Sequence, residues 1–220
     1  MRSFVWATSH DLKEPLRTIG SFAGLLQKKH SDQLDKDGQD YLHFMMAGVK
    51  KMSQLLKDLL SYAVVFEQGK IPRWQVDMQA VAQKAIKFMD EDIQANRVRL
   101  QVGQLPVVKA NPAMMCQLMQ NLLSNAIRFN DKEHIRIDID YTDKGDTYHF
   151  FIKDNGIGIE QKYQGKIFTS FQRLNPGLHD GSGLGLSICK EIVEKHSGKL
   201  WLHSQPGAGS TFFFSIPKDH

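Results

Sequence analysis

The stretch GSGLGLSICKEIVEKHSG, residues 181–198, sets a glycine-rich turn in front of a helix expected near 184–196, which Gly198 closes. Free N–H groups at a helix start and flexible glycines suit the binding of phosphate groups. The turn lacks the spacing of a dinucleotide-binding fingerprint, because no strand leads directly into it. It also lacks the Gly-Lys-Ser/Thr of a Walker motif. Gly181, Gly183 and Gly185 are therefore candidate phosphate-binding residues that fit neither pattern.

Upstream of this stretch, DNGIGI at residues 154–159 directly follows an expected strand. Gly156 and Gly158 allow the backbone to approach a ligand closely. The carboxylate of Asp154 can accept a hydrogen bond from an exocyclic amine, such as that of adenine. The residues alone leave a second interpretation open, in which this segment is a β-turn that binds no ligand.

Farther upstream, NLLSNAIRF at residues 121–129 puts two asparagines inside an apolar helix. Asn121 and Asn125 are four residues apart and share one helical face, with Arg128 on a nearby face. Neutral oxygens beside phosphates suit a Mg²⁺ ion that is bound mainly by a nucleotide. The alternative is that both asparagines only bond locally, although two asparagines in an apolar helix need a partner.

The segment IFTSFQRLNPGLHDGSG, residues 167–183, separates the two glycine-rich turns. Its second half is rich in Gly, Pro and Asn, which predicts a mobile lid over the site. Phe168 and Phe171 are expected to anchor the base of this lid. Arg173 can reach a terminal phosphate, and a merely solvated Arg173 is the competing interpretation.

Near the start of the chain, SHDLKEPLR at residues 9–17 holds a histidine next to an acid. On a helix, His10 points away from the apolar stripe that follows it and into solvent. Asp11 can accept a hydrogen bond from one ring nitrogen and leave the other as a nucleophile. Pro15 lacks the N–H that would bond the Asp11 carbonyl, so the helix can bend there. Spacing alone is equally compatible with an ordinary exposed histidine.

The first third of the chain predicts a helical hairpin, with helices near 2–29 and 36–66 and a polar turn at 30–38. Apolar residues repeat at heptad spacing in both helices. They are Leu12, Leu16, Ile19, Ala23 and Leu26 in the first helix and Leu42, Met45, Val49, Met52, Leu56, Leu59 and Ala63 in the second. One hairpin cannot bury both seams, so we expect a homodimer that forms a four-helix bundle. Because His10 is so near Met1, we also expect the first helix to begin upstream, in a longer protein.

After a Gly- and Pro-containing boundary at residues 67–72, the pattern changes to helices mixed with strands. The expected elements are a helix from Asp77 to about Asn96, a strand at 98–102, a helix at 112–129, strands at 135–142 and 147–153, a helix near 184–196, and strands at 200–204 and 210–216. This order predicts an α+β sandwich with helices on one face of a mixed sheet. We therefore expect two domains, residues 1–67 and 72–218.

Composition excludes several classes of protein. The 28 basic and 24 acidic residues are interspersed, so a net charge of +4 does not indicate nucleic-acid binding. No apolar run approaches the ~20 residues that a membrane span needs, and no signal peptide is visible. Cys116 and Cys189 lie in helical patterns and are expected to be reduced core thiols. We expect a cytoplasmic location for this segment, with the full-length protein either soluble or tethered to a membrane.

Taken together, these motifs resemble the catalytic core of two-component sensor histidine kinases over nearly the full chain. The sequence HDL-x-EPLR is similar to the subgroup often found behind phytochrome-like sensors. The resemblance implies a dimerisation and phosphotransfer domain, followed by an ATP-binding domain of the gyrase and chaperone type. The ATP-binding residues that it implies are Asn121, Asn125, Arg128, Asp154, Gly156, Gly158, Phe168, Phe171, Gly181, Gly183, Leu184, Gly185 and Thr211.

The resemblance also implies an activity, ATP- and Mg²⁺-dependent autophosphorylation. His10 would attack the γ-phosphate with Asp11 as general base, and an aspartate of a response regulator receiver domain would then take the phosphoryl group. Arg173, Arg128 and Mg²⁺, held through the nucleotide near Asn121 and Asn125, would act by positioning and charge neutralisation. Many family members carry Thr or Asn where this chain has Glu14, so we expect weak dephosphorylation of the regulator.

Two other functions compete with the kinase. One is an ATPase of the same fold that drives a conformational change, against which the exposed His10 argues. The other is a catalytically silent dimeric adaptor that retains ATP binding, against which the complete set of nucleotide motifs argues. The sensor domain is expected upstream of this chain. The signal, the cognate regulator and transfer within or between subunits do not follow from the sequence.

Overall fold

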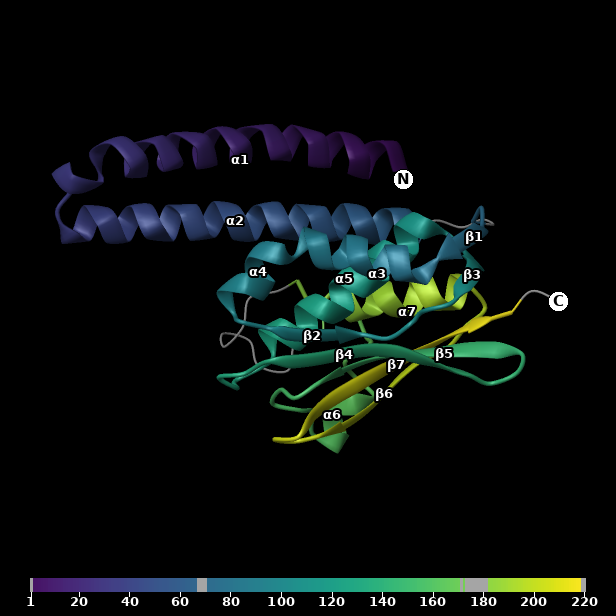
Figure 1. The fold of residues 1–220 in the computed structure, drawn as a ribbon. Helices are drawn as coiled ribbons and strands as arrows, with labels where there is room; N and C mark the ends of the chain where they lie inside the picture. The colour runs from purple at the N-terminus through teal and green to yellow at the C-terminus, as the bar shows by residue number, and fades with distance from the viewer. Residues whose placement is uncertain (1, 67–70, 171, 173–181, 219–220) are drawn as a thin grey trace. The chain divides into compact units, whose positions relative to one another are not determined.

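A computed structural model describes residues 2–66, 71–170, 172 and 182–218, with the side chains of the first helix described from Leu12 onward. The chain forms two compact units (Figure 1). The helical unit contains residues 1–67 with 180–184, and the mixed unit contains 68–179 with 185–220. Among the helices of the described residues, none has the length and apolar character to cross a membrane.

The helical unit confirms the predicted hairpin. Helix α1 (Arg2–His30) is followed by a 3₁₀ turn (Ser31–Gln33) and by helix α2 (Lys36–Val65). Asp35 caps α2 by accepting a hydrogen bond from the Gly38 N–H at 2.8 Å. Leu16 and Ala23 of α1 and Leu42 of α2 are buried. A Cβ on Gly20 would lie only 3.1 Å from Val49 Cγ1, so the two helices pack closely there.

The other half of the heptad seam stays exposed in this hairpin. Six of its apolar side chains have exposed fractions between 40% and 50%, and they recur every seven residues in each helix. They are Leu12, Ile19 and Leu26 of α1 and Met45, Met52 and Leu59 of α2. A single copy therefore leaves a continuous apolar stripe in contact with solvent.

The mixed unit is built on two sheets. A two-stranded antiparallel sheet joins β1 (Trp74–Asp77) to β3 (Val107–Ala110). A five-stranded sheet has the order β2-β4-β5-β7-β6, in which β2 and β4 are parallel and all other neighbours are antiparallel. Its strands are β2 (Arg99–Val102), β4 (Arg136–Asp143), β5 (Thr147–Asp154), β6 (Leu200–Gln205) and β7 (Gly209–Pro217).

Helices cover one face of the larger sheet, which confirms the predicted layering (Figure 1). The helices of this unit are α3 (Met78–Phe88), α4 (Asp90–Ala95), α5 (Pro112–Arg128), the short α6 (Gln161–Gln164) and α7 (Gly185–Lys195). Helix α5 packs between α3 and α7. Under these helices, the rings of Phe150 and Phe214 are fully buried and stack at 4.9 Å between centroids. Burial of such side chains is the main source of stability for a unit of this kind.

Several elements differ from the sequence-based expectation. The single helix predicted from Asp77 to Asn96 is wrong: α3 ends at Phe88 and α4 begins at Asp90. The Met89 N–H bonds the Ile86 carbonyl in a tight turn, and the acidic residues that follow favour a new helix start. The sheet of β1 and β3 was not predicted, because each strand has only four residues and one or two buried side chains.

Candidate nucleotide site

Asp154 ends β5 and is a buried carboxylate, with an exposed fraction of 7%. Its Oδ1 accepts hydrogen bonds from the N–H of Gly156 at 2.8 Å and from the N–H of Ser210 at 3.1 Å. Burial raises the pKa of this carboxyl above its ordinary value, and the two hydrogen bonds lower it in part. Because both bonds go to one oxygen, Oδ2 is the oxygen that can accept from a ligand.

The glycines after Asp154 are required by the packing of the turn. A Cβ on Gly156 would collide with the backbone carbonyl oxygen of Phe129, at the end of α5. Gly158 has a φ of +69°, and a Cβ there would collide with the carbonyl oxygen of Gln205. The Ile157 N–H donates to the Phe129 carbonyl at 3.1 Å. The turn and the end of α5 are therefore in direct contact.

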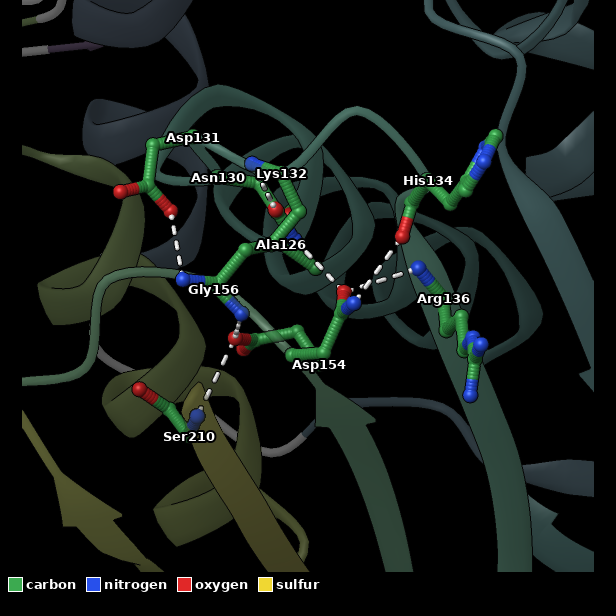
Figure 2. A network of polar contacts seen from close by, with 10 residues as sticks. Ala126, Asn130, Asp131, Lys132, His134, Arg136, Asp154, Gly156 and Ser210 are labelled. Atoms are coloured by element: carbon green, nitrogen blue, oxygen red, sulfur yellow. Dashed lines mark hydrogen bonds and ion pairs between the residues drawn. The ribbon is translucent and has the colours of Figure 1, made fainter. Parts of the chain in front are cut away.

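Asn155 joins the end of β5 to the segment after α5, where its partners Asn130, His134 and Arg136 are labelled in Figure 2. Its Oδ1 accepts from Asn130 Nδ2 at 3.1 Å and from the Arg136 N–H at 2.9 Å. Its Nδ2 donates to the His134 carbonyl at 3.0 Å. Asn130 in turn accepts from the Lys132 N–H at 3.1 Å through its own Oδ1. The loop between α5 and β4 is thereby fixed to the end of β5.

Helix α5 carries the predicted asparagines toward the start of α7. Asn111 caps α5 by accepting from the Met114 N–H at 3.1 Å, and Pro112 occupies the first turn. Asn121 and Asn125 are both half-buried. Asn121 Nδ2 donates to the Gly185 carbonyl at 3.3 Å, which joins α5 to the first residue of α7.

A buried cysteine lies beside Asn121 in α7. Burial raises the pKa of Cys189 to about 12, and a hydrogen bond with Asn121 lowers it in part. Cys116 is also a buried free thiol, which confirms the expected reduced pair. Neither position has the exposed, electropositive surroundings of a reactive cysteine.

The buried His196 links the N-terminal end of α5 to the C-terminal end of α7. Its Nε2 accepts from the Asn111 N–H at 2.9 Å, and its Nδ1 lies 2.7 Å from the Ile192 carbonyl oxygen. This pair of contacts assigns the proton to Nδ1. Burial lowers the pKa of His196, the Ile192 bond raises it, and the charge of Arg73 lowers it further.

Pro72 and Arg73, which lead into β1, bond to the same ends of α5 and α7. Arg73 donates to the Lys195 carbonyl at 2.6 Å, and Asn111 Nδ2 donates to the Pro72 carbonyl at 3.2 Å. The residues just before β1 therefore contact the first turn of α5 and the last turn of α7.

The structure brings together some of the sequence-predicted site residues and leaves others undescribed. Asn121 meets Gly185, and the turn of Asp154, Gly156 and Gly158 contacts the end of α5 on one side and β7 at Ser210 on the other. Thr211 follows Ser210 in β7 and is half-buried, as are Arg128 and Phe168. Leu184 is buried, and Gly183 has a φ of +73°. Phe171, Arg173 and Gly181 lie outside the described residues, as do the side chains of His10 and Asp11.

Sequence reasoning missed Asn130, Asn155 and His196. The signal for Asn155 was its place between Asp154 and Gly156, and the signal for His196 was its position before the closing Gly198. In the described part of the chain, no cluster of three or more His, Cys, Asp or Glu side chains is placed to hold a metal ion. The amide oxygens of Asn121 and Asn125 are the donors that fit a Mg²⁺ ion carried by a nucleotide.

Comparison with known families and proteins matches both units. Residues 110–220 match the family "Histidine kinase-, DNA gyrase B-, and HSP90-like ATPase", and residues 1–63 match "His Kinase A (phospho-acceptor) domain". Phytochrome-like protein Cph1 of Synechocystis sp. is 38% identical over 218 residues, which is 99% of this chain and 29% of that relative. The chain therefore spans less than a third of the length of that relative.

Solved structures share the fold. Full-length ShkA in complex with AMPPNP matches with a TM-score of 0.75 and 20% identity, covering 99% of this chain and 46% of ShkA. Histidine kinase ThkA in complex with response regulator protein TrrA matches with a TM-score of 0.66 and 20% identity, covering 99% of this chain and 63% of that one.

Proposed function

This chain belongs to the histidine kinase-, DNA gyrase B- and HSP90-like ATPases, and we propose that it phosphorylates itself on His10. It is the catalytic core of a two-component sensor histidine kinase of the phytochrome-like subgroup. The phosphoryl group then passes to an aspartate of a response regulator. The observation that carries the proposal is the buried Asp154, whose Oδ1 is held by two backbone N–H groups. We assign phosphotransfer to residues 1–67 and ATP binding to residues 72–218.

Recognition of adenine falls to Asp154 in this proposal. Its Oδ2 accepts a hydrogen bond from the exocyclic amine of the base, since Oδ1 is already engaged. A buried acceptor of this kind discriminates strongly against a base that lacks the matching donor, because the carboxylate would then stay unpaired. Gly156 and Gly158 would let the backbone of the turn lie against the base, and we also assign Phe168 and Phe171 to the nucleotide site.

Binding of the phosphates falls to α5 and to the start of α7. We assign Gly181, Gly183, Leu184, Gly185 and Thr211 to phosphate binding, because a glycine-rich turn before a helix offers free N–H groups to phosphate oxygens. Asn121 and Asn125 would hold Mg²⁺ together with the phosphate oxygens, and the ion would supply charge neutralisation at the transferred phosphoryl group. Arg128 and Arg173 add positive charge at the same end.

The phosphotransfer step joins the two units. One ring nitrogen of His10 attacks the γ-phosphorus, the bond to the bridging oxygen breaks, and ADP leaves. Asp11 acts as general base by accepting the proton of the other ring nitrogen. Most of the acceleration comes from holding the nucleophile in line with the phosphorus.

A homodimer is part of the proposal. The exposed stripe of α1 and α2 is the surface through which two hairpins form a four-helix bundle. A response regulator is the proposed acceptor, in keeping with the ThkA relative whose structure contains TrrA. An upstream sensor is the proposed source of control. The runner-up function is a dimeric adaptor that binds ATP without phosphotransfer.

Labelling with γ-³²P ATP and Mg²⁺ tests the proposal. We expect label on the protein that is acid-labile and base-stable, as a phosphoramidate is, and that is lost in His10→Gln. His43→Gln, which changes an exposed histidine of α2, is the matched control and should keep the label. ATP binding without label would favour the adaptor, and ATP hydrolysis without label would favour a conformational ATPase.

A further inference from the structure

Asn155 uses nearly all of its hydrogen-bonding capacity on the protein. Its Oδ1 accepts two bonds, from Asn130 Nδ2 at 3.1 Å and the Arg136 N–H at 2.9 Å, and its Nδ2 donates one, to the His134 carbonyl at 3.0 Å. An amide oxygen has two lone pairs, so no acceptor capacity remains for a ligand. Asn155 is adjacent in sequence to Asp154, the residue proposed to bind the base, yet its side chain bonds to Asn130, His134 and Arg136, in the segment that follows α5.

The partners of Asn155 lie on the segment that follows the proposed phosphate-binding face. Asn130 comes two residues after Arg128, and its Nδ2 also lies 3.5 Å from the Ala126 carbonyl in the last turn of α5. Through Asn130, Asn155 therefore reaches the C-terminal end of α5. A second link runs in parallel, from the Ile157 N–H to the Phe129 carbonyl at 3.1 Å. The two links together fix the turn after β5 against α5.

We infer that Asn155 is a positioning residue that sets the distance between Asp154 and the asparagines of α5. This inference rests on the proposed function, in which Asp154 binds the base while Asn121 and Asn125 bind the phosphate end. A nucleotide engages both groups at once only if their spacing matches its own length. In enzymes generally, a misplacement of about 1 Å in such an alignment can lower the reaction rate by about 100-fold.

Loss of the Asn155 side chain leaves the fold in place. The backbone link from Ile157 to Phe129 and the close contact of Gly156 with the same carbonyl do not involve this side chain. The loop at residues 130–136 gains freedom, and the end of α5 is then held by one link instead of two. The effect therefore falls on ligands that span both groups, and it spares a ligand that uses Asp154 alone.

Comparing two ligands in the full chain tests the inference. Isothermal titration measures a non-hydrolysable ATP analogue with Mg²⁺, and an NMR titration measures adenosine. Asn155→Ala should weaken the ATP analogue by about tenfold to 100-fold and adenosine by less than about twofold, a range seen when supporting partners of a binding group are removed. A purely structural loss would weaken both ligands by the same factor.

Three further variants sharpen the test. Asn155→Asp keeps the acceptor for Asn130 and Arg136 but loses the donor to the His134 carbonyl, so it should restore part of the ATP affinity. Asn130→Ala removes the same link from the other side, and adding it to Asn155→Ala should cost nothing more, because coupled residues are not additive. Asn96→Ala, which removes an Asn hydrogen bond to the Asp92 carbonyl at the end of α4, is the matched control and should leave both ligands unchanged.

Three results would overturn the inference: equal loss of both ligands, unchanged ATP affinity in folded Asn155→Ala, or additive losses in the double variant. If Asn155→Ala does not fold, Asn130→Ala and Asn155→Asp decide the question by the same ligand ratio. Failure of the wild-type chain to bind the ATP analogue would instead overturn the proposed function, and this inference with it.

Discussion

At the scale of single residues, the site depends on a carboxylate that the fold itself disfavours. Asp154 is buried, and that burial raises its pKa above the ordinary 3.8. A group whose pKa is raised on folding stabilises the fold below its unfolded pKa and loses that contribution as the pH rises through its folded pKa. The ionised form, which the proposed contact with adenine uses, is therefore kept at a cost in stability.

Asp154→Asn should separate stability from binding. Asn keeps an oxygen that can accept from Gly156 and Ser210, and it removes the buried charge. We expect the fold to be as stable as the wild type near pH 7 or up to about 1 kcal/mol more stable, and ATP affinity to fall by at least about tenfold, since bonds to charged groups contribute about 1.5–3 kcal/mol. Urea unfolding at pH 4 and pH 7, with calorimetric titration of ATP, measures both effects. A marked loss of stability at pH 7 would contradict this account.

His196 predicts the pH dependence of the mixed unit. Its pKa is lowered from the ordinary 6.5, so the unfolded chain takes up a proton before the folded chain does. Stability is full above about pH 6.5 and falls as the pH drops below it, because the neutral ring holds the Asn111 N–H. His196→Gln should be less stable at pH 8 and should lose less stability between pH 8 and pH 5.5. His203→Gln, at an exposed histidine of β6, should retain the wild-type slope.

The residue scale also limits what the sequence could predict about the site. The glycines and Asp154 were predictable because a turn of this kind needs a fixed order of residue types. The pairing of Asn130 with Asn155 was not, because the two residues are 25 positions apart in sequence. Only the fold brings them within bonding distance.

At the scale of elements, capping residues predicted the helices well. Asp77 and Asn111 cap α3 and α5 as expected, and the hairpin of β4 and β5 turns at residues 143–147. The break between α3 and α4 escaped prediction because the apolar pattern continues through Met89, whose side chain is buried like those of a helix interior. The pair β1 and β3 escaped because short strands gain most of their stability from tertiary packing.

A glycine substitution tests how tightly the turn after β5 is packed. Gly158→Ala forces a φ of +69° on an L-residue and drives a Cβ into the Gln205 carbonyl. Gly145→Ala is the matched control, because φ there is +76° but nothing lies within 4 Å. We expect about 1–2 kcal/mol of lost stability for Gly145→Ala from backbone strain alone, and clearly more for Gly158→Ala. Equal losses in urea unfolding would mean that the turn yields to the extra methyl group.

At the scale of the whole molecule, the helical unit leaves half of its seam uncovered. Leu16, Ala23 and Leu42 are buried within one hairpin, whereas Ile19 and Met52 are 49% and 50% exposed. Heptad spacing predicted the seam, but only the structure distinguishes the side chains that one hairpin buries from those that it leaves exposed. In α1 the exposed side chains alternate with the buried Leu16 and Ala23, whereas in α2 they alternate with the buried Leu42 and with half-buried side chains.

Ile19→Glu should weaken the proposed homodimer. Dimerisation would bury the new carboxylate without a partner, which costs several kcal/mol. We expect the dissociation constant measured by sedimentation to rise by at least about 100-fold. Ser21→Glu adds the same charge at an exposed position of α1 roughly opposite Ile19 and should leave the dimer intact. Dimers of unchanged affinity in Ile19→Glu would show that the exposed stripe is not the dimer surface.

The hydrogen bonds of Pro72 and Arg73 define the shortest truncation that should fold stably as an isolated nucleotide-binding domain. A truncation beginning at Ile71 retains both, whereas one beginning at Trp74 loses the bonds to Lys195 and Asn111. Two lost bonds of about 1 kcal/mol each correspond to a melting temperature lower by about 4–8 °C for a domain of this size. Calorimetry of the two truncations would measure it. The two residues before β1 are therefore part of the folded mixed unit, because they bond to the first turn of α5 and the last turn of α7.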